Sequence, residues 1–193
     1  ELSGILQWSS KTSHGSMPDD DIEGWQAYVK EMVETYPYVK RWEVWNEPPN
    51  FSNNSSAFAY GQIVAAAYDQ VKSIDPSVKV GLAAKSVHLN YMADAINSGA
   101  RDKFDYITLH PYEVSSMIAA GELSVFMNIR TLTRRMLEQY NPEKAAVPIH
   151  FTEVGSELNP ELPDDVAQRV QAEHLVKIFA LSLAQGIGKI HWF

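Results

Sequence analysis

Short hydrophobic segments alternate along the chain with longer amphipathic segments. Short apolar runs bounded by turn residues are typical of buried strands, whereas apolar positions that recur every three or four residues are typical of helices. On this pattern we predict six strands, at residues 4–8, 39–45, 78–83, 104–109, 147–151 and 187–193. Helices are predicted between them, at residues 18–36, 56–74, 89–98, 122–140 and 164–184.

The strict alternation of strand and helix predicts parallel strands joined by right-handed crossovers. A doubly wound open sheet and a (β/α) barrel both fit this order. No glycine-rich phosphate loop follows any predicted strand, which disfavours a dinucleotide-binding sheet. The sequence contains no convincing linker, so we expect residues 1–193 to form one domain.

Composition narrows the classes of function. The chain carries 16 basic and 24 acidic residues, a formal charge of −8, so a face that binds nucleic-acid phosphates or anionic membranes is not expected. The absence of cysteine excludes disulfides and thiol chemistry. No apolar run is long enough to span a membrane, and the first residues do not resemble a signal peptide. The compartment stays open between the cytoplasm and secretion.

The run Trp-Glu-Val-Trp-Asn-Glu-Pro at residues 42–48 is the most informative segment. Proline cannot continue strand pairing, so the strand must end there. Glu47 is thereby expected at the C-terminal edge of a parallel sheet, where barrel enzymes build their active sites. Tryptophan rings beside it suit the apolar face of a sugar. Of the two tryptophans, we expect Trp45 to line the floor of the cleft.

A second carboxylate, Glu153, follows the strand at residues 147–151. Two carboxylates aimed at one point from separate strands suit glycoside hydrolysis. One acid protonates the leaving oxygen, and the other attacks the anomeric carbon or activates water. His110 and Tyr112 follow the preceding strand, and a tyrosine hydroxyl there would hold a nucleophilic carboxylate ionised. Trp192 would form an aromatic platform after the last strand.

These motifs resemble those of glycoside hydrolase clan A, the retaining (β/α)8 enzymes with catalytic glutamates on strands four and seven. The run at residues 42–48 is most similar to glycoside hydrolase family 39, which includes β-xylosidases and bacterial exopolysaccharide hydrolases. The resemblance extends along essentially the whole chain. It implies that Glu47 is the acid/base and Glu153 the nucleophile. It also implies that sugar is contacted by Asn46, His110, Tyr112, Trp192 and, on a weaker match, Trp8.

The resemblance also implies an incomplete barrel. If Glu47 ends strand four, only one strand precedes it, so we expect about six β-α units, equivalent to strands three to eight. A full barrel of this class has roughly 250 residues. Unpaired sheet edges recruit partners, so we expect the strands at residues 4–8 and 187–192 to pair across a homodimer or to be covered by the termini.

Plainer interpretations compete at several positions. Glu43 is expected to be a buried structural ion, paired with a lysine such as Lys79. His88, His110 and His150 could converge on a metal, but no ligand motif has the usual spacing, so we expect neither metal nor cofactor. The functional alternative is a catalytically impaired, carbohydrate-binding fragment that needs a partner chain. The sugar itself and the choice between endo and exo cleavage stay open.

Overall fold

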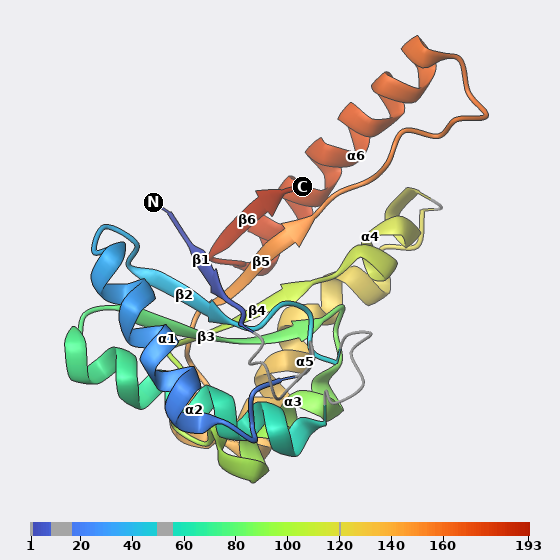
Figure 1. Ribbon diagram of the computed structural model, residues 1–193. Coiled ribbons are helices and arrows are strands. Elements are labelled where there is room, and N and C mark those ends of the chain that lie inside the picture. The colour runs from blue at the N-terminus through green and yellow to red at the C-terminus, as the bar shows by residue number, and fades with distance from the viewer. Residues whose placement is uncertain (1, 9–16, 50–55, 120) are drawn as a thin grey trace.

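A computed structural model describes residues 2–8, 17–49, 56–119 and 121–193. Within these residues the sheet has six strands: β1 (Gly4–Leu6), β2 (Arg41–Val44), β3 (Lys79–Lys85), β4 (Tyr106–His110), β5 (Ile149–Val154) and β6 (Lys189–Trp192). All neighbours pair in parallel, and the strands lie in the order of the sequence. The sheet curls into a half-barrel (Figure 1). The prediction of an incomplete TIM barrel is therefore confirmed.

Helices alternate with the strands and cover the outer face of the sheet (Figure 1). They are α1 (Ile22–Thr35), α2 (Ala57–Ile74), α3 (Leu89–Ala95), α4 (Tyr112–Ala119), α5 (Ser124–Tyr140) and α6 (Asp164–Gln185). A π-helical turn extends α3 over Ile96–Ala100, and a 3₁₀ turn at Pro142–Lys144 precedes β5. The sequence pattern predicted all of these helices except α4, the 3₁₀ turn and the separate π-helical turn.

The ends of two helices follow from local capping. The Asp21 carboxylate accepts a hydrogen bond from the Gly24 N–H at 3.0 Å, and the Ser56 hydroxyl accepts one from the Ala59 N–H at 3.1 Å. Each bond satisfies a backbone donor that the first helical turn leaves without a partner. Inside α1 the buried residues are Trp25, Val29 and Val33, a helical spacing that turns one face toward the sheet.

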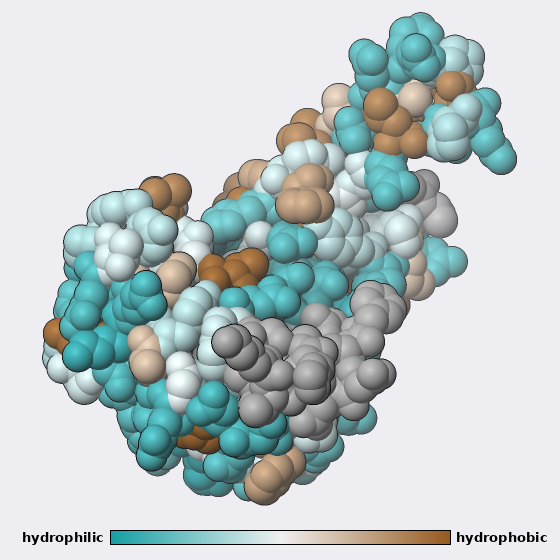
Figure 2. Space-filling view, in the orientation of Figure 1, coloured by the Kyte–Doolittle hydropathy of each residue, from teal (hydrophilic) through white to brown (hydrophobic). Residues whose placement is uncertain are grey.

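The last helix is packed less completely than the others. The α6 segment projects away from the body of the molecule (Figure 1), and hydrophobic surface gathers over it in Figure 2. Its exposed apolar residues are Val170, Val176 and Leu183. None of the helices in the described part of the chain is long and apolar enough to cross a membrane.

The two outer strands form the ends of the described sheet. β1 pairs with β2, and β6 pairs with β5; within the described residues neither has a second neighbour. Ile5 of β1 and Phe193 after β6 are exposed. Edge strands of this kind are where another chain can add. The expected homodimer through these edges stays a prediction.

Candidate active site

The loop after β2 turns Glu47 toward the middle of the sheet. Trp45 and Glu47 have φ angles of 64° and 49°, in the left-handed region that side chains other than glycine rarely adopt. Such residues cost about 1 kcal/mol or more each. Backbone hydrogen bonds hold the turn, because the Trp45 N–H donates to Leu6 at 2.8 Å and the Pro48 carbonyl accepts from Lys85 at 3.0 Å.

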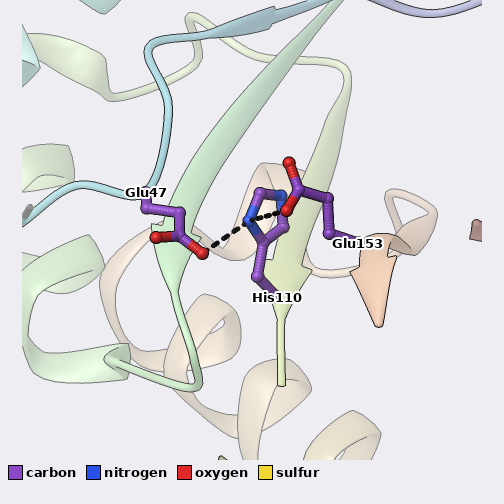
Figure 3. A group of neighbouring side chains, drawn as sticks. All are labelled: Glu47, His110 and Glu153. Carbon is purple, nitrogen blue, oxygen red and sulfur yellow. Dashed lines mark hydrogen bonds and ion pairs between the residues drawn. The ribbon is translucent and has the colours of Figure 1, made fainter. Parts of the chain in front are cut away.

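His110, the last residue of β4, lies between the two glutamates (Figure 3). Its Nδ1 is 3.0 Å from Glu47 Oε1 and 3.6 Å from Glu153 Oε2. Its Nε2 is 3.0 Å from the Thr152 hydroxyl and 3.5 Å from Glu43 Oε1. The ring is 1% exposed. One buried imidazole therefore faces three carboxylates.

Glu153 reaches this point because β5 is irregular. The register between β5 and β6 shifts between Phe151 and Val154. Thr152 and Glu153, which are consecutive, both have side chains beside the His110 ring. Regular alternation would have sent one of them to the opposite face. The hydroxyl of Tyr112, the first residue of α4, donates to Glu153 Oε2 at 3.2 Å.

The two glutamates are close enough to act on one bond. One ligand atom from each of Glu47, His110 and Glu153 lies within 4.8 Å of the others. Carboxyl groups about 5–5.5 Å apart suit a retaining glycosidase, whereas about 6.5–9.5 Å suits an inverting one. The same three atoms have a spacing compatible with a divalent cation. His88 and His150 are not part of this cluster within the described residues.

The charges around the site shift the pKa values of two side chains. Burial by itself lowers the pKa of His110. The carboxylate of Glu43 and the charge of Glu153 act in the opposite direction, followed by the hydrogen bond with Glu47. The net effect raises the pKa of His110 above its usual value. Burial, followed by the charge of Glu153, raises the pKa of Tyr112, so its hydroxyl stays a hydrogen-bond donor.

A cavity of about 840 Å³ opens beside the glutamates, between α4 and α6. Besides Glu47, Glu153 and Tyr112, its lining includes Ser116, His174 and Phe193. The Phe193 ring is 79% exposed. A Cβ atom at Gly155 would collide with the backbone oxygen of Phe193, so only glycine allows the chain to approach so closely there.

Comparison with known proteins decides the classification. The model of glycosyl hydrolases family 39 matches residues 10–185. The chain belongs to this family. No curated protein sequence matches it.

Solved structures that share this fold include a β-xylosidase and a glucosidase. The monomeric β-xylosidase of Caulobacter crescentus CB15 has a TM-score of 0.68 and 17% identity, over 98% of this chain and 44% of the xylosidase. A glucosidase from Croceicoccus marinus has a TM-score of 0.67 and 16% identity, over 90% of this chain and 38% of the glucosidase. A GH53 catalytic domain from Ignisphaera aggregans has a TM-score of 0.60 and 18% identity, over 96% of this chain and 57% of that domain. The family 39 chain thus spans less than two thirds of each.

Several residues predicted to contact sugar in this family 39 chain do lie together. His110 and Tyr112 contact the glutamates directly. Asn46 is half-buried and immediately precedes Glu47. Glu43 is buried as expected, but it faces His110, whereas the suggested partner Lys79 is exposed at the start of β3.

The prediction that Trp45 lines the cleft floor is wrong. Its side chain is 1% exposed and packs edge-to-face on Trp25 of α1, with ring centroids 6.5 Å apart. Because β2 ends at Val44 and Trp45 has a positive φ, strand alternation no longer sets its direction. The ring belongs to the core between sheet and helices.

The expected contacts of Trp8 and Trp192 with sugar stay predictions, and what the structure shows is how the two rings pack. Trp8 stacks on Tyr28 of α1, with ring centroids 6.0 Å apart. Trp192 pairs in register with Val154, a fully buried core residue, and packs against the same core. Neither tryptophan lines the 840 Å³ cavity. Phe193, the residue after Trp192, does line the cavity, together with Tyr112.

The sequence analysis missed Ser116 and His174 as cavity-lining residues. Ser116 lies in α4, a helix that the periodicity did not predict, and His174 lies in the middle of α6. His174 Nε2 contacts the Ser115 carbonyl oxygen at 2.8 Å, which joins the two helices that flank the cavity. No local pattern marks either residue.

Proposed function

We propose that this protein hydrolyses β-linked oligosaccharides, polysaccharides or simple β-glycosides with net retention, by double displacement. The observation that carries the proposal is the spacing of Glu47 and Glu153, whose facing oxygens lie within 4.8 Å. A short separation of this kind favours direct attack by the second carboxylate over attack by a water molecule held between it and the sugar, which inversion requires. Membership of family 39 supports the same reaction class.

In the first step, a Glu153 oxygen forms a bond to the anomeric carbon, and the bond to the leaving oxygen breaks. Glu47 gives its proton to that oxygen, so the leaving group departs as an alcohol. The Tyr112 hydroxyl, 3.2 Å from Glu153 Oε2, stabilises the charged carboxylate before attack. The sugar is then covalently linked to Glu153.

In the second step, Glu47 removes a proton from water, and the water oxygen attacks the anomeric carbon from the vacated side. The bond to Glu153 breaks, and the carboxylate re-forms. Two inversions at one carbon give retention. No step requires a metal or an organic cofactor.

The test uses an activated nitrophenyl glycoside. Glu153→Ala should abolish turnover, and added azide should restore it with inverted product, because azide attacks from the face that Glu153 occupied. In Glu47→Ala, the first step should stay fast for substrates with a good leaving group. For substrates with a poor leaving group, its rate should fall by about 10²–10⁴-fold. Glu122→Gln, an exposed carboxylate next to α5, is the matched control and should behave as wild type.

The alternative function is sugar binding without hydrolysis. The observation in its favour is that residues 1–193 span 44% and 38% of the xylosidase and glucosidase, so these residues form only part of a barrel. Binding of oligosaccharides with no hydrolysis, unchanged in the Glu47→Ala, Glu153→Ala double variant, would replace the catalytic proposal. Turnover that survives in Glu153→Ala without azide would refute the catalytic proposal directly.

A further inference from the structure

Glu43 is a buried carboxylate that the proposed reaction does not use. It lies in the middle of β2 and is 2% exposed. Its neighbour in register on β3 is Gly81, whose missing side chain leaves space on the inner face of the sheet. A Cβ atom at Gly81 would lie 2.6 Å from the Tyr106 ring, so this space is already closed to any larger residue.

The side chain of Glu43 points toward the Nε2 atom of His110. Its Oε1 is 3.5 Å from His110 Nε2, on the opposite side of the ring from the two catalytic glutamates. Within the described residues this oxygen accepts no hydrogen bond of normal geometry. A buried carboxylate is costly unless a positive charge compensates it. An imidazolium at this distance supplies such a charge.

Every element around His110 contributes a polar or charged group. β2 and its following loop provide Glu43 and Glu47, β5 provides Thr152 and Glu153, and α4 provides Tyr112. Beside these, β3 places Lys85 opposite His110 in register, and Tyr106 lies on the same strand as His110 within the field of Glu43 and Arg41. Three carboxylates thus face the ring, and one neighbouring lysine opposes them.

The Nδ1 edge of the ring lies beside Glu47 and Glu153. His110 Nδ1 is 3.0 Å from Glu47 and 3.6 Å from Glu153, so a proton on Nδ1 lies between both carboxylates. A charged imidazole donates from both nitrogens, whereas a neutral one donates from one alone. If Nε2 is also protonated, the ring is charged and Nδ1 always carries a proton. If the ring is neutral, its single proton can be on either nitrogen.

We infer that Glu43 is a positioning residue that acts through His110: it keeps the imidazole doubly protonated, so that Nδ1–H is a permanent donor between the catalytic pair. This inference rests on the proposed function, since it assigns Glu43 a part in that reaction. The histidine then offsets the negative charge of Glu153, and one oxygen of Glu47 can accept from Nδ1–H while its other oxygen carries the proton used in the first step. The raised pKa of His110 agrees with this arrangement.

The decisive measurement is the titration of His110 by NMR in the full chain with ¹⁵N-labelled histidine. The chain has six histidines, and His110→Gln identifies the resonances. We expect both ring nitrogens of His110 to stay protonated through neutral pH. In Glu43→Gln, which preserves the shape of the side chain, the midpoint should fall by about 1 unit or more. Glu43→Asp retains the charge and should fall less.

Two controls separate this effect from general damage. Glu122→Gln removes an exposed carboxylate and should leave the His110 titration unchanged. His174, buried at the other end of the cavity, is an internal control in each spectrum and should not respond to Glu43→Gln. In activity assays, Glu43→Gln should lower kcat more than it raises KM and should move the alkaline limb of the pH profile to lower pH.

A wild-type His110 that titrates at or below the ordinary histidine value would overturn the inference, and so would a midpoint that Glu43→Gln leaves unchanged. Should Glu43→Gln not fold, the wild-type midpoint and the Glu43→Asp titration decide the question. The NMR result does not depend on turnover. Absence of hydrolysis by the wild type would therefore count against the proposed function. The effect of Glu43 on the protonation of His110 would still be decided by the titration.

Discussion

The hydroxyl of Tyr60 holds β2 and β3 together where they separate, and its removal is our most quantitative prediction. Tyr60 lies in α2 and is fully buried. Its hydroxyl donates to the Val44 carbonyl at 2.9 Å and accepts from the Ala83 N–H at 2.7 Å. Val44 is the last residue of β2 before the chain turns toward Glu47. The side chain thus replaces a strand-to-strand bond at the base of the loop that carries Glu47.

Tyr60→Phe removes this bridge while the ring keeps its packing, including its stack on Tyr91 at 5.8 Å. One buried carbonyl and one buried N–H lose their partner. Each loss costs about 1–3 kcal/mol, so we expect the free energy of unfolding to fall by about 2–4 kcal/mol. A loss of about 3 kcal/mol lowers the Tm of a chain of this size by about 6–12 °C.

Urea unfolding followed by tryptophan fluorescence measures the change. The transition midpoint should fall while the slope with denaturant is unchanged. Tyr91→Phe is the matched control, because its hydroxyl makes a longer, exposed hydrogen bond to Ser56 at 3.4 Å. That variant should lose no more than about 0.5 kcal/mol. If the two variants lose the same small amount, the hydroxyl does not hold the strands, and the reasoning fails.

Three further predictions follow from the structure. Gly81→Ala places a Cβ 2.6 Å from the Tyr106 ring and should cost about 1–3 kcal/mol of overpacking, measured by urea unfolding; an unchanged midpoint would contradict it. The fold raises the pKa of His110. The charged ring therefore stabilises the fold most below the unfolded pKa of about 6.5, and this stabilisation is lost as the pH rises through the folded pKa. The unfolding free energies of wild type and His110→Gln should converge as the pH is raised. Among the described residues β1 and β6 are the outer strands of the sheet, which predicts self-association; light scattering that finds a monomer over a 100-fold concentration range, on the order of micromolar to sub-millimolar, would argue against pairing through these strands.

Periodicity predicted most of the fold because burial in this chain is locally encoded. The inward stretches of β3 and β4 are continuous apolar runs, and the start of α2 is marked by a serine that caps it. Glu47 could be placed after the C-terminal end of the strand because proline at position 48 cannot continue strand pairing, although β2 already ends at Val44. These features depend on neighbours in sequence, so the sequence contains them.

Directions of single side chains at the strand ends were not predictable in the same way. Alternation assigned Trp45 to the barrel axis, but its backbone is left-handed and the ring turns into the core. An irregularity in β5 brings Thr152 and Glu153 to the same histidine. Both effects depend on contacts with distant segments. α4 was missed because eight residues are too few to show a helical period.

The charged residues of the site and the tryptophans expected to contact sugar come from different parts of the sheet. Glu47 follows β2, His110 ends β4 and Glu153 lies in β5, so all three come from inner strands. Trp8 and Trp192, expected to contact the sugar, lie just after β1 and at the end of β6, the two outer strands of the described sheet. Neighbouring strands hold the inner ones on both sides, whereas an edge is held on one. We therefore expect the glutamate pair to keep its geometry even where sugar binding is weak, which makes activated substrates and azide rescue more sensitive assays than affinity.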